Sequence, residues 1–501
     1  MKANRYIHLL LCLCACISTR LTAQGVCASS ALAPVYSQTF GTSNNSSTKK
    51  DSTGFGISTK YTFSTSLSDG QYMITPRVQN AGKADWATGN DHTGNTNGNM
   101  YLINAGRPAS GPVDLFFSTQ VDNLCPGSVY SFSAWLVNVN TASKTVPICG
   151  AFGAGGTIPA KVKFNIKNTS GVILQTYTTP DLPLTTNTSV TPNWQQYGFQ
   201  FTLPAGTTSL ILEMRDALGG LVSYCGNDFA VDDILFSACT PTASVTLSSA
   251  STICSGTSTS INSSIINSPY SNPAYQWQKS TNAGFTWANI GTPGISASSY
   301  DITNAIVADG ATYRVLVGPD VASLSSTTCV TASNSISLTV NPSPAVTISS
   351  ASPICSGNAL LLTSVVTGGT AAFTYSWTGP NSFASTTANP IMANAPTSAG
   401  GSYSLTVTDS KGCTATNSKN VTVNTTPSVA AITGSAGACF GSIISLSNAT
   451  NGGVWSSSNT SVATVNATGA ASITGGGTAI VSYTVTNSGC AASATFTVTG
   501  A

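Results

Sequence analysis

The sequence has very little charge, with a single glutamate and only two histidines. Asp, Glu, Lys and Arg together make up 7% of the 501 residues, and the formal net charge is +2. Binding to nucleic-acid phosphates requires clustered Lys and Arg, so the sequence excludes nucleic acid as a partner. Two histidines are too few for a histidine-rich zinc site. The scarcity of Glu and Lys also excludes a long helical or coiled-coil protein, because these are strong helix formers.

Small hydroxyl residues are abundant instead. Ser and Thr account for 142 of the 501 residues, and Gly adds another 46. Together with frequent Val, this is the composition of short strands joined by turns. The sequence therefore predicts an all-β protein, and its length predicts about three to five domains.

The first 23 residues have the features of a secretory signal peptide. Lys2 and Arg5 precede an apolar run over residues 7–17, and a stretch of small residues follows up to Ala23. The run of about 11 residues is shorter than the roughly 20 needed to span a bilayer, and no later run reaches that length. We expect a mature chain that is secreted or displayed on the cell surface, without membrane insertion. No anchoring motif follows the last predicted strand, which leaves open whether the chain is released or belongs to something longer.

The cysteines outside the signal peptide are expected to form disulfides. Three of the 14 lie in the signal peptide, and the other eleven never occur in a CxxC pair, which makes a metal site or a thioredoxin-like motif unsupported. An oxidising compartment favours disulfide bonds. We predict that Cys27 and Cys239 join the two ends of the N-terminal region, whereas the sequence leaves Cys125, Cys149 and Cys225 unassigned.

From residue 241 onward the sequence repeats itself loosely three times. Each repeat has a cysteine near a short first strand, a strand with Trp, a strand with Tyr, a second cysteine and a final alternating strand. This order within about 80–100 residues is the pattern of an immunoglobulin-like (Ig-like) sandwich. The second cysteine follows the Tyr by more than the usual two residues, so we expect bonds that join a strand start to a hairpin. The predicted bonds lie within each repeat: Cys254–Cys329, Cys355–Cys413 and Cys439–Cys490.

The repeats resemble those of large secreted bacterial surface proteins. Residues 241–342 and 343–425 resemble Ig-like and PKD-like repeats, and the clearest stretches are 377–381 and 400–409. Residues 426–501 resemble a bacterial Ig-like group 2 domain, on stretches 454–465 and 475–483. The resemblance implies Ig-like folds that most often serve as spacers.

The N-terminal region, residues 24–240, is too long for one Ig-like domain. Apolar and polar residues alternate over 130–136, 161–167 and 197–203, as in half-buried antiparallel strands. Stretches 124–135, 191–214 and 226–236 resemble the galactose-binding-like jelly-roll domains that include many carbohydrate-binding modules. The fold class expected for the whole chain is therefore an N-terminal jelly-roll sandwich followed by three tandem Ig-like β-sandwiches.

Three aspartates near the last strand of this region are candidate metal ligands. Asp228, Asp232 and Asp233 lie close together, and the jelly-roll resemblance implies a structural Ca²⁺ with Asp232 or Asp233 as a ligand. Neighbouring residues on a strand point to opposite faces, so we expect at most one of the adjacent pair to be buried. The alternative is that these aspartates hydrogen-bond the backbone of a turn and a strand end.

Candidate ligand-binding residues lie in a polar loop and among the aromatic residues. The loop over residues 86–101 is rich in Asn, Asp and Gly, and it either forms part of a binding site or only leads into the next strand. Sugar recognition uses a flat ring together with a few hydrogen-bonding groups. The candidates are Trp86, Asp91, Asn99, Trp135 and Tyr224, and the aromatic ones have the alternative of a core position. Trp194 follows the core-strand pattern of the resembled family, so we interpret it as structural.

Few residue types for catalysis are present. After removal of the signal peptide the only histidine is His92, and no GxSxG motif accompanies it. The sequence therefore predicts a non-catalytic protein. The leading hypothesis is a secreted or cell-surface adhesin in which the jelly roll binds a glycan or cell-surface polysaccharide and the repeats act as spacers. The alternatives are a purely structural segment of a larger surface fibre and an accessory module of an extracellular hydrolase.

Overall fold

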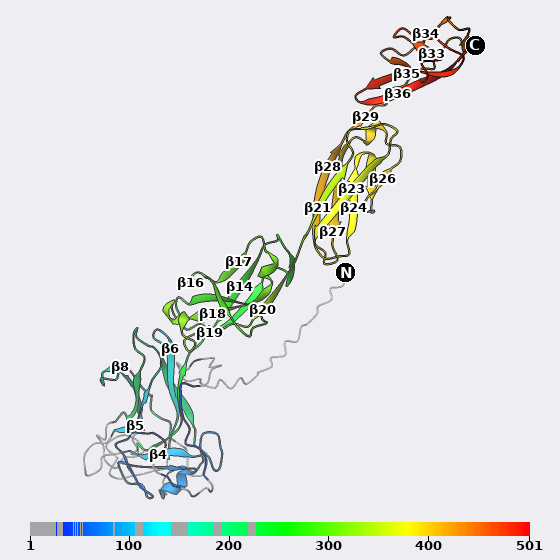
Figure 1. Ribbon diagram of the computed structural model, residues 1–501. Coiled ribbons are helices and arrows are strands. Elements are labelled where there is room, and N and C mark those ends of the chain that lie inside the picture. The colour runs from blue at the N-terminus through cyan, green and yellow to red at the C-terminus, as the bar shows by residue number, and fades with distance from the viewer. Residues whose placement is uncertain are drawn as a thin grey trace, which may run out of the picture. The chain divides into compact units, whose positions relative to one another are not determined.

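The structure is a computed structural model, and it describes most of the chain beyond the signal peptide. The described residues are 27, 34–43, 45, 47, 49–50, 52, 54–83, 86–105, 114–141, 159–184, 192–218 and 227–501. The predicted signal peptide, Cys149, Tyr224 and Cys225 lie outside them. The described residues form strands and a few short 3-10 turns, which confirms the all-β prediction (Figure 1). Among them, no helix has the length and apolar character needed to cross a membrane.

Packing divides the chain into two compact units that cut across the first repeat. One unit comprises residues 1–248, 261–300 and 312–336, and the other comprises 249–260, 301–311 and 337–501.

The N-terminal region is a sandwich of a larger and a smaller sheet. The larger has the order β2-β3-β4-β11-β6-β9, with β1 also paired to β11, and the smaller has the order β5-β10-β7-β8. The strands of the larger sheet are β1 (Tyr36–Gln38), β2 (Thr62–Phe63), β3 (Gln71–Thr75), β4 (Met100–Asn104), β6 (Val129–Asn138), β9 (Gln195–Thr202) and β11 (Phe229–Ala238). Those of the smaller sheet are β5 (Leu115–Val121), β7 (Val162–Lys167), β8 (Ile173–Thr178) and β10 (Leu210–Asp216).

The larger sheet buries apolar side chains on both faces. Alternate residues such as Phe132 and Phe236 pack with Phe164 of the smaller sheet in the main core. The residues that alternate with these along the strands, such as Leu102 and Val137, belong to a second apolar cluster. This cluster also contains residues of the 3-10 turn η1 (Val78–Ala81) and of the loop after it. Period-2 alternation places the two clusters on opposite faces. The polar loop therefore lies on the outer face of the larger sheet.

The first repeat pairs its strands in two sheets, β12-β14-β17 and β13-β20-β18-β15-β16, with β19 added to β18. The strands are β12 (Thr242–Leu247), β13 (Thr252–Cys254), β14 (Thr259–Ile266), β15 (Ala274–Ser280), β16 (Ala288–Gly294), β17 (Ser299–Ile302), β18 (Ala311–Gly318), β19 (Thr331–Ala332) and β20 (Ile336–Asn341). The short 3-10 turns η3 (Val307–Asp309) and η4 (Ala322–Ser325) flank β18.

The other two repeats follow a similar plan, and the third has fewer strands than the first two. The second has the sheets β21-β23-β26, β22-β29 and β25-β24-β27-β28, and the third has β30-β36-β35-β32 and β31-β34-β33. The second contains β21 (Pro344–Ser350), β22 (Ile354–Cys355), β23 (Leu360–Gly368), β24 (Thr374–Gly379), β25 (Phe383–Ser385), β26 (Ile391–Met392), β27 (Gly401–Thr408), β28 (Thr414–Val421) and β29 (Val423–Asn424), with turns η5 (Pro380–Ser382) and η6 (Thr397–Ala399). The third contains β30 (Gly437–Ala438), β31 (Ile443–Ser445), β32 (Val454–Ser457), β33 (Ala463–Val465), β34 (Ala470–Ile473), β35 (Gly477–Asn487) and β36 (Cys490–Gly500).

The repeats are Ig-like in the roles of their Trp and Tyr. Trp377 and Tyr403 are buried in the core of the second repeat. The Trp377 indole donates to the Thr387 carbonyl at 3.0 Å, and the Tyr403 hydroxyl donates to the Ala399 carbonyl four residues upstream at 2.8 Å. A tyrosine that bonds back to a nearby carbonyl in this way is the corner of an Ig-like sandwich. The predicted tandem β-sandwiches are thereby confirmed.

The predicted disulfides within the repeats are wrong. The structure contains Cys125–Cys329, Cys254–Cys413 and Cys355–Cys490, and exposed Cys439 is the free cysteine among the described residues. The predicted Cys27–Cys239 bond is present. The first cysteines of the first two repeats are therefore each bonded to the second cysteine of the following repeat. The N-terminal sandwich is bonded in the same way to the first repeat.

The length of the final strand explains this pairing. In each repeat the short strand at the first cysteine (β13, β22 or β30) runs parallel to the end of the repeat's last strand. Cys355 of β22, for example, lies beside Asn424 of β29. The second cysteine lies at or just before the start of the strand that leads there; Cys490, for example, begins the 11-residue β36. At about 3.3 Å per residue the two ends of such a strand lie about 33 Å apart. A disulfide joins Cα atoms about 4.4–6.8 Å apart, so the two cysteines of one repeat cannot meet.

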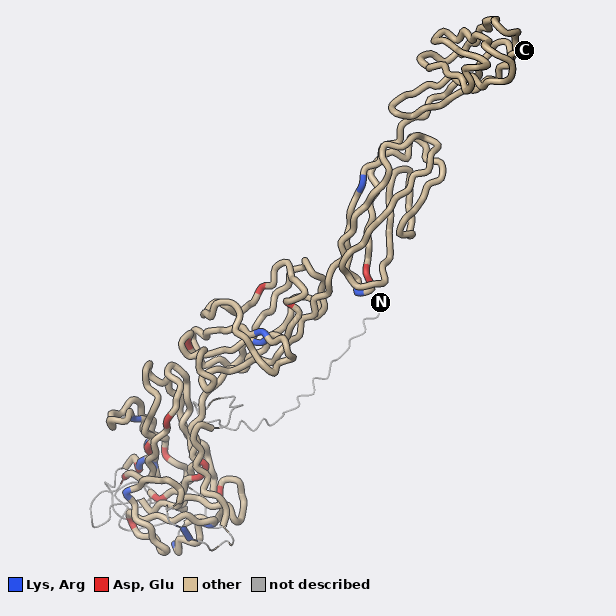
Figure 2. The backbone as a smooth tube through the Cα atoms, in the orientation of Figure 1, with Lys and Arg blue, Asp and Glu red and all other residues tan. Residues whose placement is uncertain are grey.

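Charged side chains are concentrated in the N-terminal sandwich (Figure 2). Residues 420–501 contain none, and the preceding repeats contain eight from Lys279 to Lys419. Charge-based recognition therefore has candidates mainly in the N-terminal sandwich and at a few positions in the first two repeats.

Candidate functional site

A β-bulge on β11 brings two adjacent carboxylates to one histidine. The pairing of β11 with β6 shifts register between Asp232 and Leu235, and Asp233 has a φ of +41°. An extra residue in a strand interrupts the alternation of side chains, and a positive φ is unfavourable for a residue other than glycine. The expectation that Asp232 and Asp233 point to opposite faces is therefore wrong, because both carboxylates face His92. Asp232 alone of the two is buried.

The histidine has a carboxylate at each ring nitrogen. His92 Nδ1 lies 3.0 Å from Asp232 Oδ2, and His92 Nε2 lies 3.6 Å from Asp233 Oδ2. The backbone N–H of His92 also donates to Asp232 Oδ2 at 3.3 Å, and the N–H of Asp233 donates to Asp232 Oδ1 at 2.9 Å. We call His92, Asp232 and Asp233 the histidine–aspartate group. Nδ1 is within hydrogen-bonding distance of Asp232, whereas the 3.6 Å contact of Nε2 with Asp233 is an ion pair beyond that distance.

The electrostatics favour a charged imidazole. Burial opposes the imidazolium, but the hydrogen bond and charge of Asp232, with the charges of Asp233 and Asp91, outweigh it and raise the pKa of His92. Burial and the charge of Asp232 raise the pKa of Asp233, whereas His92 lowers it. The imidazolium between two carboxylates therefore reduces their mutual repulsion.

Two tryptophans flank the group. The Trp135 ring stacks on His92, with centroids 4.7 Å apart and an interplanar angle of 18°. Trp194 meets His92 edge-on at 6.4 Å, and its indole N–H donates to the Asn90 carbonyl at 3.2 Å. Trp135 lies on β6 between Asp232 of β11 and Gln196 of β9, and its side chain is part-exposed. An aromatic ring thus lies beside carboxylate and amide groups on the outer face of the larger sheet.

Asp91 shapes the loop that carries the histidine. Its carboxylate is buried and accepts from the Thr93 hydroxyl at 2.9 Å and from the Asn95 backbone N–H at 2.8 Å. Gly98 lies against it so closely that an added Cβ would fall 1.8 Å from Asp91 Oδ2. Asp91 therefore acts on the site through the loop and through its charge.

Three other predicted site residues have structural positions. Trp86 is buried in the outer apolar cluster, where its ring has no face for a ligand. Asn99 is buried and accepts from the Ser43 hydroxyl at 2.6 Å while it donates to the Phe40 carbonyl at 3.0 Å. Asp228 is buried outside the histidine–aspartate group, and its charge helps to raise the pKa of Tyr61 in the main core. The structure therefore places these three in buried positions outside the histidine–aspartate group, because the polar loop and the residues before β11 fold onto the sheet.

His92 was not among the predicted site residues, although it lies within the polar loop over residues 86–101 that was predicted as possible part of a binding site. The sequence does contain a feature that singles out this residue: His92 is the only histidine after residue 23, and it follows Asp91 in a polar loop. Its pairing with β11 was not predictable, because 140 positions separate it from Asp232.

The donor set suits some cations better than others. The donor atoms of His92, Asp232 and Asp233 all lie within 4.8 Å of one another. Ca²⁺ prefers six to eight oxygen ligands, whereas an imidazole nitrogen suits Zn²⁺ and other transition metals. The chemistry of the group therefore fits the predicted Ca²⁺ poorly and a transition-metal ion better.

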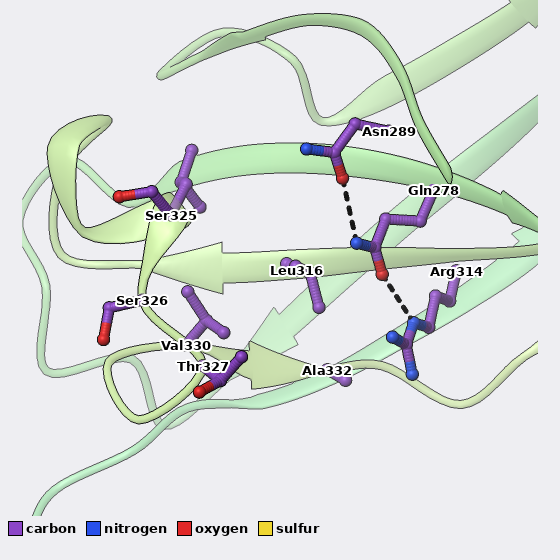
Figure 3. Close-up of a pocket in the computed structure, with 10 residues that line it drawn as sticks. Gln278, Asn289, Arg314, Leu316, Ser325, Ser326, Thr327, Val330 and Ala332 are labelled. Carbon is purple, nitrogen blue, oxygen red and sulfur yellow. Dashed lines mark hydrogen bonds between the residues drawn. The ribbon is translucent and has the colours of Figure 1, made fainter. Parts of the chain in front are cut away.

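A separate pocket lies in the first repeat, where the sequence analysis predicted no site (Figure 3). It has a volume of about 490 Å³ and is lined by Gln278, Asn289, Arg314, Leu316, Leu324, Ser325, Ser326, Thr327, Val330 and Ala332. Hydrogen bonds link its polar side from strand to strand: Arg314 Nε donates to Gln278 Oε1 at 2.8 Å, and Gln278 Nε2 donates to Asn289 Oδ1 at 2.9 Å. These residues come from three strands and share no sequence motif.

Comparisons with known proteins find one matching family model and a number of similar solved structures. Residues 243–342 match a family described as a domain of unknown function (DUF8696), a range that contains the pocket. No curated protein matches the sequence. The similar solved structures include an amphioxus IgVJ-C2 molecule (19% identity, 34% of this chain, 99% of that chain, TM-score 0.20). Extracellular domains 3–5 of Drosophila OTK are 12% identical, cover 50% of this chain and 93% of that chain, and have a TM-score of 0.21. The four N-terminal Ig domains of Dscam1 isoform 6.9 are also 12% identical, cover 65% of this chain and 80% of that chain, and have a TM-score of 0.21.

Proposed function

We propose that this chain is a non-catalytic extracellular protein of the adhesion type, whose N-terminal sandwich binds a glycan beside the histidine–aspartate group. The observation that carries the proposal is the part-exposed Trp135, which stacks on His92 between Asp232 and Gln196. A flat ring packs against the apolar face of a sugar, and the neighbouring carboxylates and amide accept and donate hydrogen bonds to its hydroxyls.

A non-catalytic role agrees with the geometry of the histidine. A general base needs a free nitrogen within hydrogen-bonding distance of the proton it removes. Both nitrogens of His92 face carboxylates instead, at 3.0 and 3.6 Å. The group holds its own side chains in place, which suits recognition of a ligand.

A divalent cation at the same group is part of the proposal. His92 Nδ1 or Nε2 and one oxygen each from Asp232 and Asp233 would be its ligands, and it would replace the proton that His92 otherwise shares with them. Calorimetric titration of the full chain with Zn²⁺ and with Ca²⁺ tests this directly. We expect heat of binding with Zn²⁺ that Asp233→Asn abolishes. Heat with Ca²⁺ alone would support the original calcium hypothesis, and heat with neither ion would remove the cation from the proposal.

We propose that the repeats act as spacers for the glycan-binding N-terminal sandwich. Their Ig-like sandwiches have no charged residue after position 419, and a disulfide connects each to the next. Disulfides persist in oxidising compartments, which supports an extracellular location. A covalent bond at each junction adds a second connection to the single polypeptide link.

The test of the ligand class is a glycan array probed with the full chain in Zn²⁺, in Ca²⁺ and in chelator. We expect a defined subset of glycans to bind, with stronger signals in Zn²⁺ than in chelator. Equal binding in all three buffers would keep the glycan and reject the cation. No binding in any buffer would reject the proposal and favour a purely structural segment of a surface fibre.

A further inference from the structure

We propose that the pocket of the first repeat binds a small organic acid, with its carboxylate on Arg314 and its apolar body on the floor of the pocket. This site is separate from the histidine–aspartate group and does not depend on the proposed glycan binding. Its lining comes from β15, β16, β18 and β19 of one sheet, from η4 and from the segment between η4 and β19.

The charge of the pocket has one sign. Arg314 is the single charged residue in the lining, which contains no Asp or Glu. Within the part of the chain that the structure describes, no ion pair involves Arg314. Partial burial lowers the pKa of Arg314, which means that water solvates this guanidinium less well than an exposed one. A carboxylate ligand would supply the missing counter-charge.

The guanidinium is held in place before a ligand arrives. Its Nε donates to Gln278 Oε1, and Gln278 is fixed in turn by Asn289. The guanidinium carbon lies 4.1 Å from the ring centroid of Trp287, which restricts the plane of the group. With Nε engaged, the two terminal nitrogens remain available, and a carboxylate pairs with such a fork through two parallel hydrogen bonds.

The remainder of the pocket selects an apolar body with a polar end. Leu316, Leu324, Val330 and Ala332 supply apolar surface, and Figure 3 shows Leu316 between the polar chain of Arg314 and the hydroxyl residues Ser325, Ser326 and Thr327. The volume of about 490 Å³ falls within the range of roughly 300–1,000 Å³ for small-molecule sites. The pocket thus fits an amphipathic monocarboxylic acid better than a highly polar sugar or a phosphate.

The wall of the pocket is tied to the N-terminal sandwich. Cys329 lies between the lining residues Thr327 and Val330, and it is bonded to Cys125. The segment that follows η4 is therefore anchored covalently, which limits how far this wall can open without a ligand.

The test is ligand-observed NMR of the full chain with octanoate and 3-phenylpropionate, each compared with its uncharged amide. We expect both acids to bind and both amides to bind about tenfold more weakly or not at all, because the amides cannot form a charge-assisted pair of hydrogen bonds with the guanidinium. Arg314→Gln is expected to abolish the preference for the acid. Lys279→Gln, which removes one positive charge from the same β15 outside the pocket lining, is the matched control and should leave binding unchanged.

The conservative variant Arg314→Lys separates loss of the site from loss of the fold. Lysine keeps the positive charge but cannot form the two parallel hydrogen bonds. We therefore expect the affinity of Arg314→Lys for the acids to lie between that of the wild type and that of Arg314→Gln. Equal binding of acid and amide, the same loss in Lys279→Gln, or no binding of any acid to the wild type would each overturn the proposal.

Discussion

Glu213 shows how the few charges of the N-terminal sandwich are used. It is the single glutamate of the chain, and Lys167 Nζ lies 2.7 Å from Oε1 while Arg215 Nε lies 2.9 Å from Oε2. Burial raises the pKa of Glu213, but the hydrogen bonds and charges of Arg215 and Lys167 outweigh it, so the pKa lies below its ordinary value. Arg215 also pairs with Asp114 at 2.9 Å, which extends the network across the smaller sheet.

Glu213→Gln is expected to lower the free energy of unfolding by about 1–3 kcal/mol at pH 7, because it leaves two largely covered cations short of a partner. The folded-state pKa of Glu213 is lowered, so the stability it contributes is present above its ordinary pKa of 4.5 and is lost as the pH falls through the lowered value. Urea denaturation of both proteins at pH 7 and at progressively lower pH measures the difference, which should shrink on acidification.

The matched control is Asp181→Asn. Asp181 pairs with Lys161 at 2.9 Å, but their side chains are 56% and 39% exposed. Solvent screens such a pair, so the expected loss is below about 0.5 kcal/mol at any pH. If Asp181→Asn lowered the free energy of unfolding as much as Glu213→Gln, burial would not be what makes the Glu213 ion pairs stabilising.

At the residue scale the sequence identified part of the candidate site. Trp135, Asp232 and Asp233 were predicted, and the structure brings them together. The role of His92 was not predicted, because it depends on a loop that folds onto β11. The common orientation of Asp232 and Asp233 depends on a bulge, which an alternation rule cannot anticipate.

At the scale of elements, the corner tyrosine fixes how the second repeat turns between its sheets. The Tyr403 hydroxyl donates to the Ala399 carbonyl of η6, and its ring covers Gly379, where an added Cβ would lie 2.5 Å from the ring. The tyrosine therefore needs both its hydroxyl and the absence of a side chain at position 379.

Tyr403→Phe is expected to lower the unfolding free energy by about 1 kcal/mol, because a buried carbonyl loses its donor while packing is retained. Tyr375→Phe, on a part-exposed ring of β24, is the control and should change stability by less than about 0.5 kcal/mol. Chemical denaturation of the full chain, followed through the transition of the second repeat, measures both. Equal effects of the two variants would show that the hydroxyl has no structural role.

Most strands were predictable from their alternating residues, and the pairing of cysteines was not. The alternation over 130–136 and 197–203 corresponds to β6 and β9, and the Trp and Tyr of the repeats occupy their expected cores. Which cysteines meet depends on where the ends of the final strand lie. The roughly ten residues after each second cysteine, taken as extended chain, were the signal that a bond within one repeat is too long.

At the scale of the whole molecule, three of the disulfides among the described residues each connect one sandwich to the next. Cys254 and Cys355 lie at equivalent positions in successive repeats, and each bonds to the hairpin of the repeat that follows. Cys439 holds the same position in the third repeat and is exposed and free. Among the cysteines that the structure describes, this pattern leaves Cys439 with a free thiol.

Peptide mapping without reduction is expected to recover peptides linking Cys125 to Cys329, Cys254 to Cys413 and Cys355 to Cys490. An alkylating reagent applied before reduction should label Cys439, because its thiol is exposed and unpaired. Linked peptides within one repeat, such as Cys439 with Cys490, would contradict the assigned pairing. Cys439→Ser serves as the control, since it should remove the label without changing the linked peptides.

The most direct measurement is the affinity of the full chain and of its Trp135→Ala variant for the glycan that gives the strongest array signal. Loss of a stacking ring is expected to weaken binding about tenfold or more. Trp287→Ala is the matched control, because it removes a tryptophan beside Arg314 in the first repeat and should leave glycan affinity unchanged. Unfolding curves of both variants confirm that they are folded. If Trp135→Ala bound the glycan as tightly as the wild type, the binding site would lie away from the histidine–aspartate group. The same conclusion would follow if Trp287→Ala weakened glycan binding and Trp135→Ala did not.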